Sequence, residues 1–377
     1  MKKSHYAGLD NLRGIAAICV LLFHRREWFG GENFMAHAYL GVDFFFLLSG
    51  FVVSHAYRER LAAGMRFGDF LLRRVIRLYP LIVVGSLLGA AALLMRTLTR
   101  GNPLPEFFPL TVVMSMLTLP AAWDPKLWPI DPPIWSLFFE MGVSIVFGLG
   151  AFALGKRALG GVVAVSLAIL VFCCLAFGSL SMGNEGGNFW AGFPRVAFPF
   201  FLGVALQRLH EEGFGRGFRI AAPLAGVALV ASFTLLPQGS ALAPYYDLLC
   251  AVVLFPVLVF GVANVATGPL ETRISKISGD LSYPLYILHF PLLWIFSAIG
   301  KVLLARDNVG PIYGAVACLL IIAISWAALK LYDEPVRAFL TARLSPRRPP
   351  AEPTPVEAAF AATLPAAIPD GAPPAST

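Results

Sequence analysis

Long apolar stretches recur along the whole chain, separated by short segments rich in charged residues, proline and glycine. A helix needs about 20 mostly apolar residues to cross a hydrocarbon core of about 30 Å, so each long stretch predicts one membrane span. A shorter apolar segment, 107–119, is interrupted by proline and predicts a re-entrant or surface helix instead. The pattern predicts an all-α polytopic membrane protein with about ten spans, at 10–26, 39–57, 76–95, 134–154, 160–178, 190–208, 219–236, 244–264, 281–304 and 311–331.

The distribution of lysine and arginine supports this count of spans. With the N-terminus in the cytoplasm, the predicted inside segments carry 20 basic residues and the outside segments carry seven, while Arg13 and Arg195 lie within spans. Counting segment 107–119 as an eleventh span would place the later basic loops outside. Because cytoplasmic loops of membrane proteins are enriched in Lys and Arg, both termini are predicted to be cytoplasmic.

The composition excludes a soluble globular protein. The chain is 58% hydrophobic and 14% charged, with a mean hydropathy of +0.73, whereas about 25% charged residues is usual in soluble domains. The net charge of +7 follows the predicted topology, so the expected partner is the lipid bilayer and not nucleic acid. All five cysteines lie in apolar runs, which favours core positions over disulfides or a metal site, and no metal is expected.

The composition changes after Leu344 to proline, alanine and charged residues. Such a segment cannot bury a hydrophobic core, so residues 345–377 are predicted to form a disordered cytoplasmic tail. Residues 1–344 are expected to form one membrane-embedded domain that contains every predicted span.

The first predicted span contains two ionisable side chains, Arg13 and His24, within LDNLRGIAAICVLLFH. A charged side chain inside a bilayer costs about 2.5 kcal/mol or more, so such a residue usually faces protein or water and marks a functional site. Their spacing puts them within about 20° of one helix face and about 16 Å apart along the axis. Either they line one channel, or Arg13 reaches the headgroups and His24 caps the helix outside the bilayer.

Three more charged residues are predicted near the outer ends of later spans. Asp43 begins the second span close to His24, where a carboxylate would fix the imidazole tautomer and raise its basicity; alternatively, Asp43 caps its own helix. Glu140 lies about 9 Å below the outer end of the fourth span and needs a partner from another helix. Arg195 in the sixth span is an available counter-ion, and such a pair is either structural or catalytic.

The predicted inside loop that ends in Arg73, Arg74 and Arg77 is the most basic part of the chain. Residues 74 and 77 share a helix face because they are three positions apart. Guanidinium groups near a helix N-terminus suit phosphates, through paired hydrogen bonds and a favourable dipole. Alternatively, these arginines only set the topology or contact anionic lipid. The sequence contains no glycine-rich nucleotide loop, which argues against a P-loop ATPase.

The ninth predicted span carries polar side chains on its inner half, within SYPLYILHFP. Tyr286 and His289 share a helix face, and the two prolines of this stretch should bend the helix and free backbone carbonyl groups. The pattern predicts either a pore lining or a polar packing seam between helices. Candidates for a pore lining are Arg195, Ser282, Tyr286 and His289, while His24 remains the preferred base.

Seven stretches of the sequence, taken together and in order, resemble the integral-membrane O-acyltransferases of acyltransferase family three, which includes nodulation-factor, O-antigen and other cell-surface glycan acetylases. They are LDNLRGIAAICVLLFH, GVDFFFLLSGFV, RRVIRLYP, WSLFFE, FFLGVAL, SYPLYILHFP and YDEP, between about residues 9 and 337. The family pattern of arginine, ten residues and histidine falls on Arg13 and His24, and its Arg-x-x-Arg pattern falls on Arg74 and Arg77. Some relatives carry an esterase-like domain after the last helix; with only a short tail, this chain looks like a stand-alone member.

The resemblance implies an enzyme of the inner membrane that uses cytoplasmic acyl-CoA, usually acetyl-CoA, as a co-substrate and holds no permanent cofactor. The acceptor would be a hydroxyl group of a cell-surface carbohydrate or glycolipid. In this hypothesis Arg73, Arg74 and Arg77 hold the CoA phosphates, and Arg13 lines the path of the pantetheine arm.

The same hypothesis gives the outer residues the chemistry. His24, oriented by Asp43, would deprotonate the acceptor hydroxyl or carry the acyl group transiently, and Glu140 would assist or position the sugar. One alternative is a secondary transporter or lipid-linked glycan translocase, in which these charged residues form a proton relay or substrate path. Another is a non-enzymatic scaffold in an envelope polysaccharide complex, which leaves the buried polar residues without a purpose.

Overall fold

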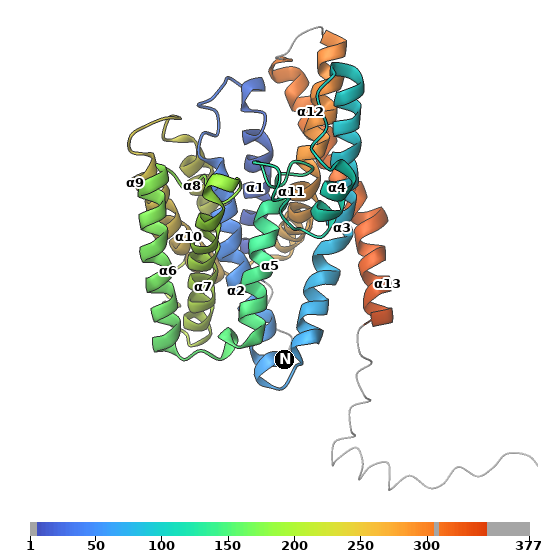
Figure 1. Cartoon of the computed structure of the whole chain (residues 1–377). Helices are drawn as coiled ribbons and strands as arrows, with labels where there is room; N and C mark the ends of the chain where they lie inside the picture. The colour runs from blue at the N-terminus through green and yellow to red at the C-terminus, as the bar shows by residue number, and fades with distance from the viewer. Residues whose placement is uncertain (1–5, 305–308, 345–377) are drawn as a thin grey trace, which may run out of the picture.

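The computed structural model describes residues 6–304 and 309–344, and within them every regular element is a helix (Figure 1). The expected tail, 345–377, lies outside the described residues. Seven of the described helical segments are long and apolar enough to cross a membrane. The prediction of an all-α polytopic membrane protein is therefore confirmed.

All ten predicted spans correspond to described helices. Three of these are short: α1 (Ala7–Phe23), α5 (Ile134–Leu149) and α8 (Ala222–Thr234) have 17, 16 and 13 residues. The span predicted at 244–264 is a continuous segment made of α9 (Ala243–Leu249), a π-helical turn and α10 (Phe255–Ala263). The other spans are α2 (Gly41–Ala62), α3 (Phe67–Arg100), α6 (Lys156–Phe177), α7 (Gly192–Glu211), α11 (Pro269–Leu304) and α12 (Gly310–Ala328).

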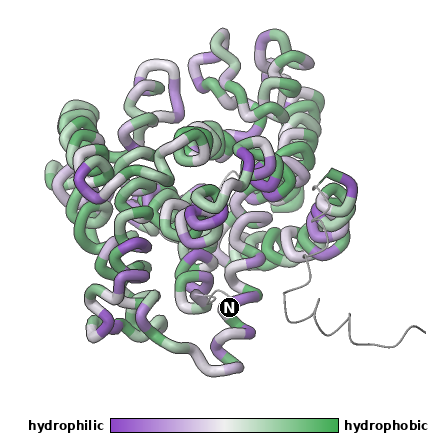
Figure 2. The backbone as a smooth tube through the Cα atoms, turned by 90° about the horizontal axis from the view of Figure 1, so that it is seen from below, coloured by the Kyte–Doolittle hydropathy of each residue, from purple (hydrophilic) through white to green (hydrophobic). Residues whose placement is uncertain are grey.

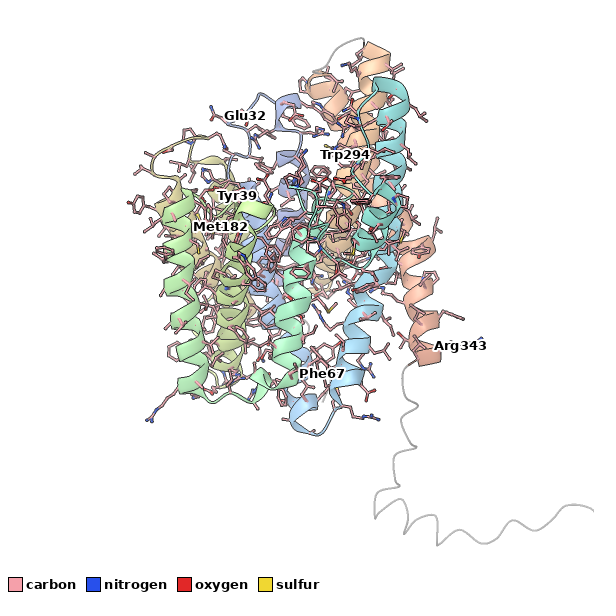
Figure 3. The ribbon with its side chains drawn as sticks, viewed as in Figure 1. Glu32, Tyr39, Phe67, Met182, Trp294 and Arg343 are labelled. Atoms are coloured by element: carbon pink, nitrogen blue, oxygen red, sulfur yellow. The ribbon has the colours of Figure 1, made fainter. Side chains whose placement is uncertain are left out.

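Buried apolar side chains fill the space between the helices in two clusters. One cluster is centred on α3, α5, α11 and α12, and the other on α8, α9 and α10, while α1, α2, α6 and α7 contribute to both. Figure 3 shows how densely the side chains occupy the bundle. In Figure 2 hydrophobic residues dominate the peripheral helices, whereas hydrophilic residues gather at helix ends and near the centre. This distribution suits a protein that is apolar toward lipid and polar along an internal path.

Helices α2 and α7 pack with their backbones in close contact. Gly50 of α2 lies against the backbone of α7, and Gly203 of α7 lies against the backbone of α2; a methyl group at either position would overlap a carbonyl oxygen. Small residues allow membrane helices to approach in this way. The contact brings Asp43 of α2 opposite Arg195 of α7.

The segment predicted as a re-entrant or surface helix at 107–119 forms α4 (Phe108–Met116). It packs against the middle of α3, where the hydroxyl groups of Ser86 and Ser115 lie 2.9 Å apart in a buried hydrogen bond. Tyr79, nearer the start of α3, donates a hydrogen bond of 3.4 Å to the carbonyl oxygen of Leu117. The chain therefore leaves the end of α3 and folds back along it (Figure 1), and we call residues 101–133 the re-entrant segment.

The chain stays beside the middle of α3 after α4 ends. Ile130 and Asp131 contact α3 at Gly89 and Gly85, and α5 begins shortly afterwards at Ile134. Helix α5 consequently starts inside the bundle and not at its surface, which explains its short length. The first four residues of α5, Ile134 to Leu137, are all buried.

Candidate active site

Three adjoining cavities run through the helical bundle. The arginine cavity, of about 390 Å³, lies between α2, α3 and α13 (Glu334–Leu344). The central cavity, of about 180 Å³, lies between α1, α2, α3, α5 and α11. The histidine cavity, of about 850 Å³, lies between the end of α1, the re-entrant segment and α11. The main polar residues that line the arginine cavity are Arg73, Arg74, Arg77, Arg337 and Thr341. Those that line the central cavity are Arg13, Ser49, Arg74, Arg77, Glu140 and Ser282. Those that line the histidine cavity are His24, Tyr39, Arg96, Lys126, Glu185 and Arg195.

The three cavities share walls. Arg74 and Arg77 line both the arginine and the central cavity, and Val42 and Tyr286 line both the central and the histidine cavity. At this second junction the hydroxyl groups of Tyr286 and Ser136 lie 2.7 Å apart in a buried hydrogen bond. Three cavities with shared walls therefore extend from the arginines of α3 to His24, and Tyr286 stands between the central and the histidine cavity.

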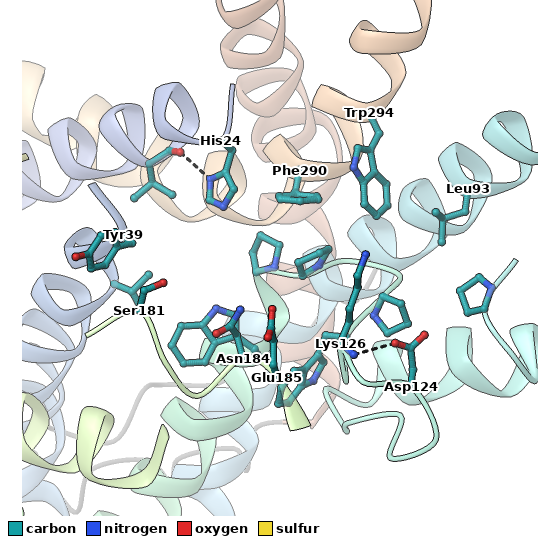
Figure 4. A pocket seen from close by; sticks show the side chains of 18 of the residues that line it. His24, Tyr39, Leu93, Asp124, Lys126, Ser181, Asn184, Glu185, Phe290 and Trp294 are labelled. Atoms are coloured by element: carbon teal, nitrogen blue, oxygen red, sulfur yellow. Dashed lines mark hydrogen bonds between the residues drawn. The ribbon is translucent and has the colours of Figure 1, made fainter. Parts of the chain in front are cut away.

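His24 follows the last residue of α1, and its ring points into the histidine cavity (Figure 4). Its Nδ1 lies 2.8 Å from the carbonyl oxygen of Val20. A carbonyl oxygen can only accept a hydrogen bond, so Nδ1 carries the proton of the neutral ring and Nε2 keeps its lone pair. A histidine held in this tautomer can remove a proton from a hydroxyl group bound in the cavity.

The predicted contact between His24 and Asp43 is wrong. Asp43 instead accepts two hydrogen bonds from Arg195, of 3.0 Å from Nε and 2.9 Å from Nη2, and both side chains are only 2% exposed. Arg195 also donates a 2.7 Å hydrogen bond to the carbonyl oxygen of Met182. The close packing of α2 on α7 places Asp43 opposite Arg195, and the backbone at Val20 holds the His24 tautomer.

The predicted pair of Glu140 and Arg195 is also wrong. Oε1 of Glu140 accepts hydrogen bonds from Nη2 of Arg74 at 2.7 Å and from the Ser49 hydroxyl at 2.8 Å. The prediction relied on the position of each residue within its own span, whereas the packing of the helices pairs Arg195 with Asp43 and turns Glu140 toward α2 and α3. Glu140 consequently faces the central cavity, with the arginines and not with His24.

Arg13 faces the central cavity, so Arg13 and His24 line successive cavities along one side of α1, as their spacing predicts. Its Nε donates to the Ser282 hydroxyl at 2.9 Å, and its Nη2 donates to the carbonyl oxygen of Gly279 at 2.8 Å. The carboxylate of Asp10 lies 2.9 Å from Nη2. These contacts fasten α1 to α11 and hold the guanidinium within the bundle.

Arg73 and Arg77 face the arginine cavity without an acidic partner. No carboxylate oxygen of the described residues lies within 4 Å of either guanidinium group, whereas Arg74 is paired with Glu140. Arg77 packs over the ring of Tyr283, 5.5 Å from its centroid. Unpaired guanidinium groups in a partly buried cavity favour an anionic ligand with several acceptor oxygens, such as a phosphate.

The four candidates for a pore lining divide into two groups. Ser282 lines the central cavity, Arg195 lines the histidine cavity, and Tyr286 lines both. His289 lines none of the three cavities and is 1% exposed; its ring lies behind His24, with 5.0 Å between the ring centroids. Its Nδ1 lies 2.7 Å from the carbonyl oxygen of Tyr286. His289 therefore packs against the candidate base and does not face the passage.

The histidine cavity contains aromatic and acidic groups that the sequence analysis did not single out. Its wall includes Trp128, Trp135 and Trp294, and Figure 4 shows Trp294, Glu185 and Asp124 around the same space. Most of these residues lie between the end of α3 and the first turn of α5, or in the loop at 181–185. The stretch WDPKLWPIDPPIW, with three tryptophans and two aspartates between membrane helices, is the signal that identifies this wall in the sequence.

Comparisons with known proteins agree with the resemblance of the motifs. A family model described as an acyltransferase domain, of acyltransferase family three, matches residues 6–330. "Protein 2 in picA locus" of Rhizobium radiobacter is 36% identical over 183 residues, which cover 45% of this chain and 94% of that protein. "Putative O-acetyltransferase SACOL0978" of Staphylococcus aureus (strain COL) is 36% identical over 101 residues, 26% of this chain and 16% of that protein.

A third relative is "Putative peptidoglycan O-acetyltransferase YrhL" of Bacillus subtilis (strain 168), 26% identical over 216 residues, 53% of this chain. The matched region is only 32% of that protein, so this relative and the staphylococcal one are much longer than the part they share with this chain. No solved structure matches the chain. The family match over residues 6–330 shows that the chain belongs to acyltransferase family three, and it is a multi-pass membrane enzyme of this O-acyltransferase family.

Proposed function

We propose that the protein transfers an acyl group, most often acetyl, from cytoplasmic acyl-CoA to a hydroxyl group of a cell-surface or lipid-linked carbohydrate, in the inner membrane. The observation that carries the proposal is the series of cavities from the arginines of α3 to Nε2 of His24. One long substrate and one polyol, arriving from opposite ends, can meet in such a passage. Of the relatives described above, one is named "Putative O-acetyltransferase" and another "Putative peptidoglycan O-acetyltransferase".

The donor is proposed to enter through the arginine cavity. Arg73 and Arg77 supply the positive charge for the CoA phosphates, and Arg13 and Ser282 line the path that the pantetheine arm follows toward His24. Glu140 holds Arg74 in place, because it accepts a hydrogen bond from that guanidinium group and from Ser49. This is a different role from positioning the sugar, and it follows from the depth at which Glu140 lies.

The acceptor is proposed to bind in the histidine cavity. Tryptophan faces pack well against the apolar faces of sugar rings, and carboxylates accept hydrogen bonds from hydroxyl groups. Both kinds of group line this cavity, with Trp128 and Trp294 on its wall and Glu185 beside them. Its volume of about 850 Å³ leaves space for an acceptor that carries several hydroxyl groups.

The proposed chemistry uses Nε2 of His24 as the base. Nε2 takes the proton of the acceptor hydroxyl while its oxygen forms a bond to the carbonyl carbon of the thioester. The carbon–sulfur bond then breaks, and the CoA thiolate receives the proton from His24, which leaves an ester and free CoA thiol. A general base of this kind accelerates such a reaction by about 10²- to 10⁴-fold.

The experiment that tests this function measures thiol release by the purified protein in detergent, with acetyl-CoA and a carbohydrate acceptor. An acyltransferase releases CoA thiol in detergent, where there is only one compartment. A transporter needs two compartments to show activity and does not consume acyl-CoA. We expect release that depends on the acceptor, together with loss of an acetyl ester from surface glycans, seen by mass spectrometry, in cells that lack the gene. Absence of acyl-CoA consumption with unchanged glycans would reject the proposal in favour of transport.

A further inference from the structure

Helix α13 forms one wall of the arginine cavity, although its sequence shows no phosphate motif. It contributes Arg337 and Thr341, opposite Arg73, Arg74 and Arg77 of α3. A π-helical turn, Leu329–Asp333, joins α12 to α13 and directs the chain back onto α3, with α13 beside the lower part of α3 in Figure 1. Four guanidinium groups therefore line one cavity of about 390 Å³, and its lining includes no Asp or Glu.

Arg337 forms an ion pair with a carboxylate one turn earlier in the chain. Its Nη2 lies 2.8 Å from Oδ2 of Asp333, a carboxylate that is fully buried, and its Nε lies 3.4 Å from the backbone oxygen of the same residue. The remaining N–H groups of the guanidinium are free to donate to a ligand in the cavity. Asp333 neutralises one of the four positive charges and Glu140 another, so Arg73 and Arg77 keep an excess of positive charge.

The order of the arginines along the passage separates two phosphate positions. Arg74 and Arg77 line both the arginine and the central cavity, whereas Arg73, Arg337 and Thr341 line the arginine cavity alone and so lie further from His24. Extended acyl-CoA presents its groups in a matching order: the thioester, the pantetheine arm, the pyrophosphate and then the 3′-phosphate of the adenosine. The deeper arginines are thus opposite the pyrophosphate when the thioester reaches His24.

We propose that Arg337 of α13, together with Arg73, binds the 3′-phosphate of acyl-CoA, while Arg74 and Arg77 bind the pyrophosphate. This inference rests on the proposed acyl-CoA donor and adds which residue holds which phosphate. Guanidinium groups suit this task because they offer paired, charge-assisted hydrogen bonds to phosphate oxygens. Thr341, one turn further along α13, adds a hydroxyl group to the same wall.

The experiment compares two ligands on the full-length protein in detergent: acetyl-CoA and acetyl-dephospho-CoA, which lacks only the 3′-phosphate. The variant is Arg337→Gln, and the matched control is Arg343→Gln on the same helix, because Arg343 does not line the cavity and points away from the bundle (Figure 3). We expect Arg337→Gln to weaken acetyl-CoA binding about tenfold or more and to leave acetyl-dephospho-CoA binding unchanged. Arg343→Gln should change neither affinity.

Equal weakening of both ligands in Arg337→Gln, or weakening of neither, would overturn the assignment of the 3′-phosphate. An anionic lipid headgroup offers the same phosphate chemistry, so the titrations are repeated with added phosphatidylglycerol. If phosphatidylglycerol competes less strongly in Arg337→Gln, while the preference for acetyl-CoA over acetyl-dephospho-CoA is unchanged, Arg337 binds the lipid headgroup. This result would also overturn the proposal. If the unaltered protein binds neither CoA compound, the proposal of an acyl-CoA donor is wrong. If it binds acetyl-CoA and Arg337→Gln binds it equally well, only the assignment of Arg337 is wrong.

Discussion

The arginine cavity and the histidine cavity differ in how their charges are compensated. In the histidine cavity the buried charge of Arg195 is neutralised by Asp43, so its wall carries a fixed ion pair beside an uncharged base. In the arginine cavity Arg73 and Arg77 have no carboxylate of the described residues within 4 Å. A site with compensated charges suits a neutral polyol, whereas a site with excess positive charge suits phosphates. This difference in charge agrees with the proposal that a carbohydrate acceptor binds in the histidine cavity and acyl-CoA in the arginine cavity.

The largest expected effect separates chemistry from binding. His24→Ala should lower the rate of acetyl transfer by about 10²- to 10⁴-fold, because it removes the general base. The affinity for acetyl-CoA should stay unchanged, since His24 lies in a different cavity from the arginines. Initial rates and acetyl-CoA titrations on one preparation check both statements. Retained transfer in this variant would remove His24 from the mechanism.

A second prediction concerns the ion pair of the histidine cavity. Asp43→Ala leaves the charge of Arg195 buried without a partner, and breaking a buried pair in this way costs about 3–5 kcal/mol. We expect a clear fall in the melting temperature of the protein in detergent and a lower amount in the membrane. Asp280→Ala is the control, because it removes a partner from a partly exposed pair with Lys276, where less than about 1 kcal/mol is expected. Equal effects of the two variants would show that burial of the Asp43 pair is not what matters.

The arginine cavity is tested most directly at Arg77. Within the described residues, its replacement leaves no carboxylate without its ion-pair partner, unlike replacement of Arg74, which is paired with Glu140. Arg77→Gln should weaken acetyl-CoA binding about tenfold or more, since a hydrogen bond to a charged group contributes about 1.5–3 kcal/mol. The concentration of acceptor that gives half-maximal rate should not change. Arg66→Gln is the matched control, because Arg66 is an exposed residue of the same basic region that does not line the cavity. An unchanged donor affinity in Arg77→Gln would return the arginines to a topological role.

The smallest expected effect is at the aromatic wall of the histidine cavity. Trp294 lines this cavity and lies under the guanidinium of Arg96, 5.3 Å from the ring centroid. Trp294→Ala should raise the KM for the acceptor a few-fold, because an aromatic packing contact contributes about 0.5–1.5 kcal/mol. The KM for acetyl-CoA should stay the same. A change in the donor KM alone would contradict the assignment of the two cavities.

The sequence by itself determined the helices and the residues that share a face along one of them. The length and apolar character of each stretch predicted helices at all ten positions, and the spacing of Arg13 and His24 put both residues on one side of the first helix. Both predictions depend only on the rise and turn of a single helix, which are the same in every α-helix. The same helix geometry predicted that Arg74 and Arg77 of α3 share a face, because they are three positions apart.

Only the tertiary structure decided which charges meet. The partners of Asp43, Glu140 and Arg195 follow from glycine contacts between α2 and α7 and from the re-entrant segment that starts α5 deep in the bundle. The position of a residue within its own span does not say which neighbouring helix it faces, and Glu140 faces Arg74 of α3 and Ser49 of α2. The place of Arg337 depends likewise on the return of α13 onto α3. Contacts between helices depend on packing across long separations in the chain, and periodicity along one helix carries no information about them.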